Sequence, residues 1–465
     1  MKKVIGIVLV ITMLMSAAFL SACSNENASS TTSSNNTAQS DKTTASTGNS
    51  SSNTSSSAPV EIRVAWWGDT TRNKLYEQIL DAFETEYPNI KTVREPLSWT
   101  DYWDKLTVQS ASGGAPDFLG MHPQFASDYV HRGVLEPLDN FVKDGTIDLS
   151  NFTQAAIDSG KVDNTIYMVS MGLTAASMFV NTTMLQELNV AVPNFDWTWD
   201  DLKAIGLATR KALDAKGEEN AWLIDDGSGA YQLFRYWVRQ NGKIDLYTAD
   251  GKIAYTAEDA ASWFTMWEDL RDNKIVPDAA TTTEYAKATL EDSLFARKKT
   301  AIRGVPANQY KLYCEALPND KIIMVRNPAM VNGKVAEYVE GAHFAISAKT
   351  TPEKKLAAAK LLNFWVNDED SIKLFKLDQG VPANTKMVEY LNSLLDDQDK
   401  AVVDYVNKIA SISTEPTTFP PSGASTVDSL FQQIAEKVRF GQLTPKDAGE
   451  QLVSQAQATL DSNKK

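Results

Sequence analysis

The chain has 465 residues, of which 43% are hydrophobic, 9% aromatic and 22% charged. This balance is typical of a globular protein and excludes a collagen, a coiled coil or a wholly disordered chain. Its 59 acidic residues outnumber its 45 basic ones, for a formal net charge of −14, which argues against nucleic acid as a partner because binding to phosphates needs clustered Lys and Arg. With only Cys23 and Cys314, the sequence holds neither a disulfide framework nor a cysteine-rich zinc site.

Residues 1–22 are typical of an export signal, because two lysines precede an apolar run over 4–20 that contains no acidic residue. The run ends in LSAC at 20–23, which resembles the bacterial lipoprotein signal, whose cysteine becomes the lipidated first residue. The alternatives are an ordinary cleaved signal or a membrane span, although a span would need nearer to about 20 apolar residues. We therefore expect Cys23 to carry a lipid.

Residues 24–57 contain 13 Ser, 7 Thr and 6 Asn and no large apolar side chain. Such a segment cannot bury enough surface to offset its ordering entropy, so residues 23–58 are predicted to be a lipidated cysteine followed by a disordered tether. A chain of this length reaches roughly 30 Å. The predicted location is the outer face of the cell membrane, or the periplasm if the source has two membranes.

Strand and helix patterns alternate at the start of the body. The predicted elements are a strand over 60–67, a helix with apolar residues at 75, 79, 83 and 87 that Pro88 ends, a strand over 90–93, a helix capped by Thr100 and a strand over 117–121. This alternation favours an α/β class with a mostly parallel sheet.

Helix starts are predicted further along at a capping box over 198–201 and at the Thr-Pro pairs 351–352 and 444–445. Asp250-Gly251 predicts the turn of a hairpin between 244–246 and 253–255. The C-terminal third is predicted to be mainly helical.

The sequence offers little sign of catalysis. It lacks the GxSxG, HExxH, GxxxxGK[ST] and GxGxxG motifs, and its three histidines are His122, His131 and His343. His122 and His131 are nine residues apart, which fits no ligand spacing and favours structural or surface roles, and the turn at 250–251 lacks the ligands of a calcium loop. We expect no catalytic residue, no metal and no cofactor, although no spacing excludes a carboxylate pair for glycoside hydrolysis.

Tryptophans at the edges of predicted loops point instead to binding. Trp66 and Trp67 end the first strand, where open α/β sheets present ligand crevices, and Trp99 precedes a helix. Flat aromatic faces pack against sugar rings while polar side chains bind the hydroxyls. A core position is an equally good interpretation for these three residues.

Taken together, the motifs resemble the extracellular solute-binding proteins of ABC sugar importers, the maltose-binding-protein-like family 1 sugar-binding proteins. The resemblance covers nearly the whole body. The segments that carry it are VAWWGD at 64–69, FETEYPNIKT at 83–92, WTDYWDKLTVQSASGGAPD at 99–117, GVLEPLD at 133–139, FDWTWDDLKAI at 195–205 and GAHFAISAKTTPEKKLAAAKLLNFWVNDEDSIKLFKLDQGVPAN at 341–384.

This resemblance implies a two-lobe periplasmic-binding-protein-like fold of type II, each lobe a mixed, mostly parallel sheet flanked by helices, with the ligand cleft at the hinge. Lobe 1 would comprise 59–173 and a return over 341–395. Lobe 2 would comprise 174–340 and the C-terminal helices over 396–465. The ligand would be clamped by hinge closure.

The resemblance also implies site residues. It places Trp66, Trp67 and Asp69 at the first ligand-contacting loop and Gln124 where relatives often carry an Asp, a change that suggests a different hydroxyl pattern or an acidic sugar. The second-lobe loop at 303–308 lacks the usual stacking Trp. Arg303, Asn308 or Tyr310 would take over that role. Tyr231 and Trp237, which follow the Gly-Ser-Gly at 227–229, are further candidates in the second lobe, with a core position as the alternative for each.

Arg72 follows the first-strand loop at a helix N-terminus, where a guanidinium and backbone N–H groups can meet a carboxylate. A uronate-containing oligosaccharide is then a candidate ligand, against the alternative of a surface arginine.

The predicted function is therefore that of a lipid-anchored, monomeric binding protein. It would capture an oligosaccharide and deliver it to ABC permease subunits served by a separate ATPase. The alternatives are a lipid-anchored polysaccharide hydrolase or lyase and a binding protein for a non-sugar solute.

Overall fold

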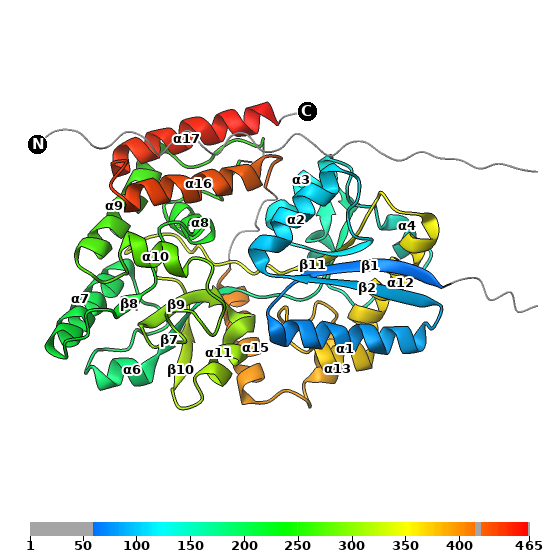
Figure 1. The fold of residues 1–465 in the computed structure, drawn as a ribbon, viewed down its shortest axis with the longest axis horizontal. Helices are drawn as coiled ribbons and strands as arrows, with labels where there is room; N and C mark the ends of the chain where they lie inside the picture. The colour runs from blue at the N-terminus through cyan, green and yellow to red at the C-terminus, as the bar shows by residue number, and fades with distance from the viewer. Residues whose placement is uncertain (1–58, 249, 414–419, 464–465) are drawn as a thin grey trace, which may run out of the picture. The chain divides into compact units, whose positions relative to one another are not determined.

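The computed structural model describes residues 59–248, 250–413 and 420–463 (Figure 1). The predicted export signal, the lipidated Cys23 and the tether lie outside these residues. The strands are β1 (Val60–Trp67), β2 (Ile90–Leu97), β3 (Phe118–Met121), β4 (Lys161–Val162), β5 (Thr165–Ile166), β6 (Met168–Ser170), β7 (Ala176–Asn181), β8 (Trp222–Ile224), β9 (Thr300–Pro306), β10 (Ile322–Val325) and β11 (His343–Ile346).

The helices before residue 300 are α1 (Thr70–Glu86), α2 (Trp99–Ala111), α3 (Pro123–His131), α4 (Asp139–Lys143), α5 (Gln154–Asp158), α6 (Thr182–Glu187), α7 (Trp199–Ala215), α8 (Tyr231–Gln240), α9 (Ala257–Asp272) and α10 (Ala279–Tyr285). Those after it are the 3₁₀ helix η1 (Ala307–Gln309), α11 (Tyr310–Ala316), α12 (Pro352–Asn367), α13 (Glu369–Phe375), α14 (Thr385–Leu391), α15 (Asp397–Ile412), α16 (Ala424–Arg439) and α17 (Pro445–Ser462). The helical C-terminal third is confirmed.

The first sheet has the order β2-β1-β3-β11-β6 and is covered on both faces (Figure 1). β1 pairs in parallel with β2 and β3, whereas β11 is antiparallel to both β3 and β6. Trp66 stacks on Tyr76 of α1, while its neighbour Trp67 contacts Tyr102 and Trp103 of α2. Successive strand residues point to opposite faces, so the two indoles are buried on opposite sides of one sheet.

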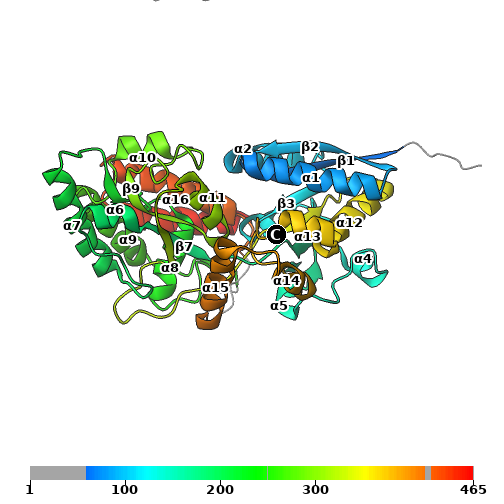
Figure 2. The ribbon, with the colours of Figure 1, turned by 90° about the horizontal axis from the view of Figure 1, so that it is seen from below.

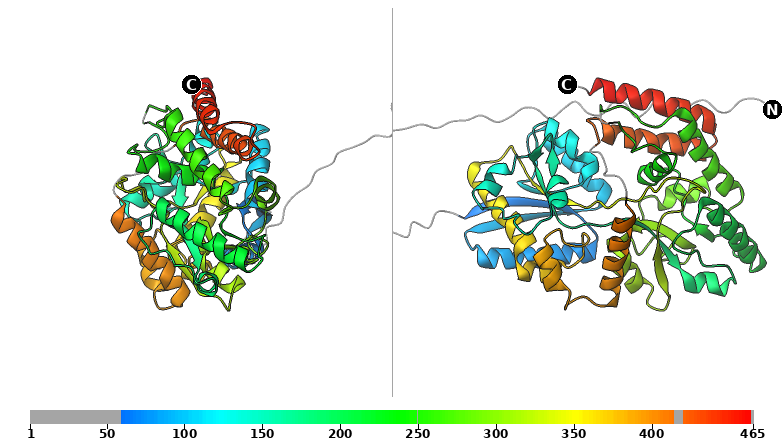
Figure 3. Two further views of the ribbon diagram at one scale, coloured as in Figure 1. Left: turned by 90° about the vertical axis from the view of Figure 1, so that its left-hand side faces the viewer. Right: turned by 180° about the vertical axis from the view of Figure 1, so that it is seen from behind.

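The second sheet has the order β10-β7-β9-β8, with only β8 and β9 parallel. Its main core draws on α7, α8, α9, α16 and α17, and α16 lies beside α17 in Figures 1 and 3. α15 lies beside α11 (Figure 2) and packs Val402, Tyr405 and Val406 into a smaller core.

The two sheets are mixed, as expected for this fold, but they are not mostly parallel: the parallel pairs are β1 with β2, β1 with β3, and β8 with β9. Strands that follow a helix on the same sheet run parallel to their neighbours, as β1, β2 and β3 do. β11 instead enters the first sheet from the segment after β10 of the second sheet, and it runs antiparallel to β3. A helical crossover returns the chain in the same direction, so the strands that it joins are parallel, whereas a strand that arrives from another sheet can enter in either direction.

Three segments meet where the chain passes between the sheets. Leu173 bridges Val381, and Thr174 bridges Glu340. A Cβ on Gly341 would lie 1.8 Å from the carbonyl oxygen of Gly172, so the backbones touch and only glycine fits. The crossing is therefore built from main chain.

Several predicted helix starts are confirmed. Thr198 caps α7 in a capping box with Asp201, and Thr351 and Thr444 cap α12 and α17. The cap at Thr100 is wrong: Ser98 accepts the N–H of Asp101 at 3.2 Å and α2 begins at Trp99. The hairpin at 250–251 is reduced to an isolated bridge between Tyr247 and Ile253.

Candidate ligand-binding site

Trp99 presents an aromatic surface at the end of the first sheet. It is 42% exposed, whereas the other ten tryptophans, all in the described part of the chain, are buried. Its ring lies 5.1 Å from that of Trp67 and 5.5 Å from that of Trp103, in edge contacts. Packing on these buried indoles fixes the Trp99 ring while it leaves part of the ring open to a ligand.

Trp66 and Trp67 lie beneath this surface. Trp66 is 2% exposed and donates its Nε1–H to Asn73 at 2.9 Å, so it belongs to the core. Trp67 is 7% exposed and lies over β3, where a Cβ on Gly120 would be 2.8 Å from the indole. Trp67 therefore supports Trp99, and the absence of a side chain at Gly120 makes the room.

His122 and Gln124 form the next part of the surface, at the end of β3. His122 caps α3 and its Nδ1 accepts the N–H of Gln124 at 3.3 Å. Burial, with the nearby charge of Arg235, lowers the pKa of His122 to about 4, so the ring is neutral at physiological pH. Since Nδ1 is an acceptor, we assign the proton to Nε2, which makes His122 a hydrogen-bond donor.

Gln124 connects this surface to helices of the second core. Its Nε2 donates to the carboxylate of Asp428 on α16, and its Oε1 accepts from Nε2 of Gln232 on α8 at 3.1 Å. Gln232 in turn accepts the hydroxyl of Tyr338 at 3.2 Å. Segments far apart in sequence thus meet at one amide side chain.

Arg235 is the centre of a buried charge cluster beside these residues. Its Nε and Nη2 donate to the two carboxylate oxygens of Asp245, each at 2.6 Å, and its Nη1 donates to Glu340 at 3.3 Å. The guanidinium carbon also lies 4.4 Å from the ring centre of Tyr338. The Glu340 side chain is 22% exposed, and burial raises the pKa of its carboxyl.

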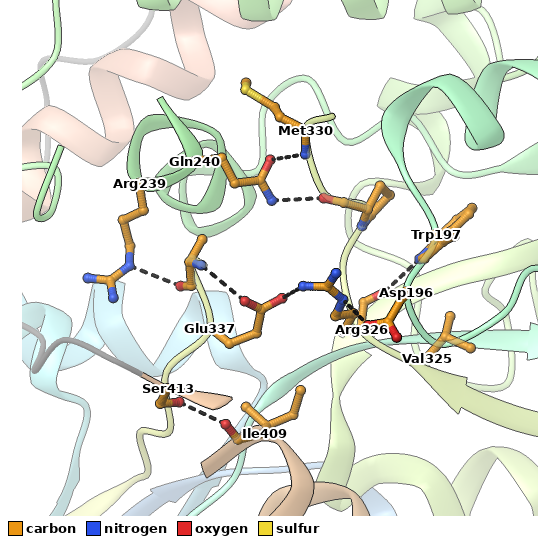
Figure 4. Close-up of polar contacts among 12 residues, drawn as sticks. Asp196, Trp197, Arg239, Gln240, Val325, Arg326, Met330, Glu337, Ile409 and Ser413 are labelled. Atoms are coloured by element: carbon orange, nitrogen blue, oxygen red, sulfur yellow. Dashed lines mark hydrogen bonds and ion pairs between the residues drawn. The ribbon is translucent and has the colours of Figure 1, made fainter. Parts of the chain in front are cut away.

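The segment that carries Glu340 to the crossing is fixed by buried polar contacts (Figure 4). Glu337 pairs with Arg326 at 2.7 Å and accepts the N–H of Ala336 at 3.0 Å. Arg239 donates to the carbonyl of Ala336, and Gln240 bonds the backbone at Pro328 and Met330. Together with the bridge between Ala329 and Thr198, these contacts fix the segment that leads to Glu340.

Arg303 and Asn308 are bonded within the protein. Arg303, in the middle of β9, pairs with Asp225, which directly follows β8. Asn308 donates its Nδ2–H to the carbonyl of Asp378 at 2.6 Å and accepts from Thr174 at 3.2 Å. Asn308 therefore connects η1 to the crossing.

Tyr231 lies in the core. It is 4% exposed, and its hydroxyl lies 3.1 Å from that of Tyr247 and 3.4 Å from that of Tyr255. Trp237 is also buried, and its Nε1–H reaches the carbonyl of Asp259. For both residues the structure matches the core alternative, because the apolar face of α8 packs into the second core.

Asp69 and Arg72 are partnered at the start of α1. Asp69 caps the helix by accepting the N–H of Arg72 at 2.9 Å. Arg72 is 9% exposed rather than a surface residue, and its Nε pairs with Asp378 at 2.7 Å. The carboxylate that Arg72 meets is one of the protein's own.

Sequence reasoning did not select Glu340, Arg235, Asp428 or Gln232, and it favoured a structural or surface role for His122. One signal was available, since Arg235 lies among the aromatic residues of one helix sequence, YQLFRYWVRQ at 231–240. A charged residue on a buried helix needs a partner. Nothing in the spacing points to Asp428 or Glu340 as neighbours.

Other features of the described residues lie away from this site or are absent. One hollow of about 360 Å³ is lined by residues at the end of α16 and by Phe440. A second, of about 350 Å³, is lined by residues that include Met184 and Arg297. Within residues 59–248, 250–413 and 420–463 no three His, Cys, Asp or Glu side chains gather as a metal site requires. The same residues include no helix with the length and apolar character of a membrane span.

Comparison with solved structures defines the class of protein as the periplasmic-binding-protein fold. A periplasmic oligogalacturonide binding protein from Yersinia enterocolitica, in complex with saturated digalacturonic acid, matches with a TM-score of 0.77 and 22% identity, over 87% of this chain and 99% of that one. An ABC substrate-binding protein from Listeria monocytogenes, in complex with cycloalternan, matches with a TM-score of 0.72 and 21% identity over the same shares.

Residues 78–404 match the family model of the bacterial extracellular solute-binding proteins. The chain belongs to this family. A relative from Brucella abortus, named only as a binding protein, is 22% identical over 363 residues, which are 78% of this chain and 82% of the relative.

Proposed function

We propose that this protein captures an oligosaccharide between the surface around Trp99 and the polar side chains beside Arg235, and delivers it to an ABC importer. The observation that carries the proposal is the Trp99 ring, exposed yet held by Trp67 and Trp103. Sugar rings pack on such aromatic faces, and the neighbouring amides of Gln124 and Gln232 suit sugar hydroxyls. The similar structures that hold digalacturonic acid and cycloalternan support a carbohydrate as the ligand.

The proposal includes the division into two lobes that the resemblance to solute-binding proteins implies. Residues 59–173 and 341–395 would form lobe 1, and residues 174–340 and 396–465 would form lobe 2. The crossing bridges at 173–174, 340 and 381 would be the hinge about which the lobes close. The contacts of Gln124 with Gln232 and Asp428 would then join the lobes.

The lipid anchor on Cys23 completes the proposal. The protein would be held at the outer face of the membrane, or in the periplasm, with the tether giving it reach to a permease. It would act as a binding protein without catalysis, with the pore and the ATPase supplied by other chains.

Substitution of Trp99 by Ala tests the role of the aromatic surface. We expect binding of an oligosaccharide to weaken by about 10- to 100-fold, because an aromatic contact with its buried area contributes roughly 1.5–3 kcal/mol. Isothermal titration calorimetry measures the change. Phe440→Ala is the matched control, since Phe440 is 47% exposed and lies at the end of α16; equal affinities for the two variants would contradict the proposal.

A further inference from the structure

The guanidinium groups near the site are already paired with carboxylates of the protein. Arg72 binds Asp378, Arg235 binds both Asp245 and Glu340, and Arg303 binds Asp225. The Arg235 pair with Asp245 uses both oxygens of one carboxylate, the strongest geometry available to arginine. The carboxylate of an acidic ligand would have to displace one of these protein carboxylates, or it would bind without an arginine to pair with.

Two carboxylates remain with capacity to accept hydrogen bonds. Glu340 uses Oε2 for Arg235, and within the described part of the chain Oε1 has no hydrogen-bond partner. Among residues 59–248, 250–413 and 420–463, the donors to Asp428 are the neutral amides of Gln124 and Gln432. Burial raises the pKa of both carboxyl groups, because each is partly removed from water.

Arg235 is a charged donor beside these carboxylates, and Asp245 and Glu340 together outweigh its single positive charge. The other donors are neutral. They are Nε2–H of His122 and the amides of Gln124 and Gln232. Neutral donors with anionic acceptors match the hydroxyl groups of a sugar, each of which both donates and accepts. A carboxylate on the ligand offers no proton to Glu340 or Asp428 and is repelled by both.

We propose that the site selects an uncharged oligosaccharide, with Glu340 and Asp428 accepting its hydroxyl protons and excluding uronates. This inference rests on the proposed sugar-binding function and deepens it. It replaces the uronate hypothesis based on Arg72, and it separates this chain from the similar structure that holds digalacturonic acid.

The test compares sugars that differ only in charge. Calorimetric titrations at pH 7 use digalacturonic acid, its dimethyl ester and a panel of neutral gluco-, galacto- and manno-oligosaccharides with their uronic acid counterparts. We expect at least one neutral sugar to bind, and its matched uronic acid to bind at least about 100-fold more weakly, because like charges brought together at an interface cost several kcal/mol. A uronate that binds as tightly as its uncharged counterpart overturns the inference, whereas a failure of every sugar overturns the proposed function itself.

Glu340→Gln tests the residue assignment, because it removes the charge and keeps the shape. The association constant for the uronate, divided by that for the neutral sugar, should rise about tenfold in this variant. Glu258→Gln changes the exposed face of α9 and should leave this ratio unchanged. Asp428→Asn provides the same readout if Glu340→Gln does not fold. An unchanged ratio in the folded variants contradicts the assignment.

Discussion

His343 lies in β11 at 1% exposure, with its Nε2 3.0 Å from the Ser159 hydroxyl. Burial, with the nearby His122, lowers its pKa to about 3. A histidine that stays neutral in the folded state but accepts a proton in the unfolded state near pH 6.5 makes folding less favourable as the pH falls. The contribution of His343 is therefore fully present above about pH 6.5 and is lost progressively toward pH 3.

This effect can be measured by urea denaturation between pH 7 and pH 5, a range above the titration of most carboxyl groups. We expect His343 alone to lower the free energy of unfolding by about 2 kcal/mol at pH 5. The variant His343→Gln should show a correspondingly smaller loss over the same range. A pH dependence identical to that of the unsubstituted chain would show that His343 is not the source.

Individual side chains were the least predictable part of the site. The end of β1 could be placed from its pattern, but helices on both faces bury both Trp66 and Trp67. Arg72 illustrates the same limit, since its partner Asp378 is 306 residues away. Local sequence can identify a residue that needs a partner, whereas the partner itself depends on the fold.

Helix α16 begins with a cap supplied by another helix. Its N-cap residue, Gly423, has no side chain to cap it. Asp128 of α3 accepts the N–H of Gly423 and the hydroxyl of Ser425, each at 2.6 Å. One carboxylate thus stabilises the start of α16 and joins it to α3, next to the Gln124–Asp428 contact.

Loss of this cap should destabilise the chain measurably. We expect Asp128→Ala to lower the free energy of unfolding by about 1–2 kcal/mol, the usual cost of removing an N-terminal cap. Urea denaturation gives the value, with Asp200→Ala in the exposed first turn of α7 as a control expected to change little. A loss no larger than that of the control would mean that Asp128 does not cap α16 in solution.

Elements with their own local signals could be predicted from the sequence. β1 and the caps at Thr198, Thr351 and Thr444 were found because strand alternation and capping chemistry are local. The start of α2 was misplaced by two residues because Ser98 and Thr100 can both cap, and only the packing of Trp99 on Trp67 and Trp103 decides between them. The antiparallel strand β11 was not predicted, because its place depends on how the chain crosses between sheets.

The whole molecule depends on contacts between distant segments. The first core joins residues 62–171 to residues 342–383, and the second joins residues 178–325 to residues 424–460. Neither composition nor periodicity indicates such a division; the resemblance to solute-binding proteins suggested it. The candidate site depends on the same long-range contacts. Trp99 and Gln124 were selected from the sequence around them, whereas Glu340 and Asp428 become part of the site only through these contacts.

The central claim is that this protein captures one oligosaccharide and leaves it intact. The most direct measurement equilibrates the purified chain with neutral oligosaccharides, removes the unbound sugar, denatures the protein and identifies what is released by mass spectrometry. The account predicts one unshortened oligosaccharide per chain, unchanged after prolonged incubation. Release of cleaved products, or retention of no sugar at all, would contradict it.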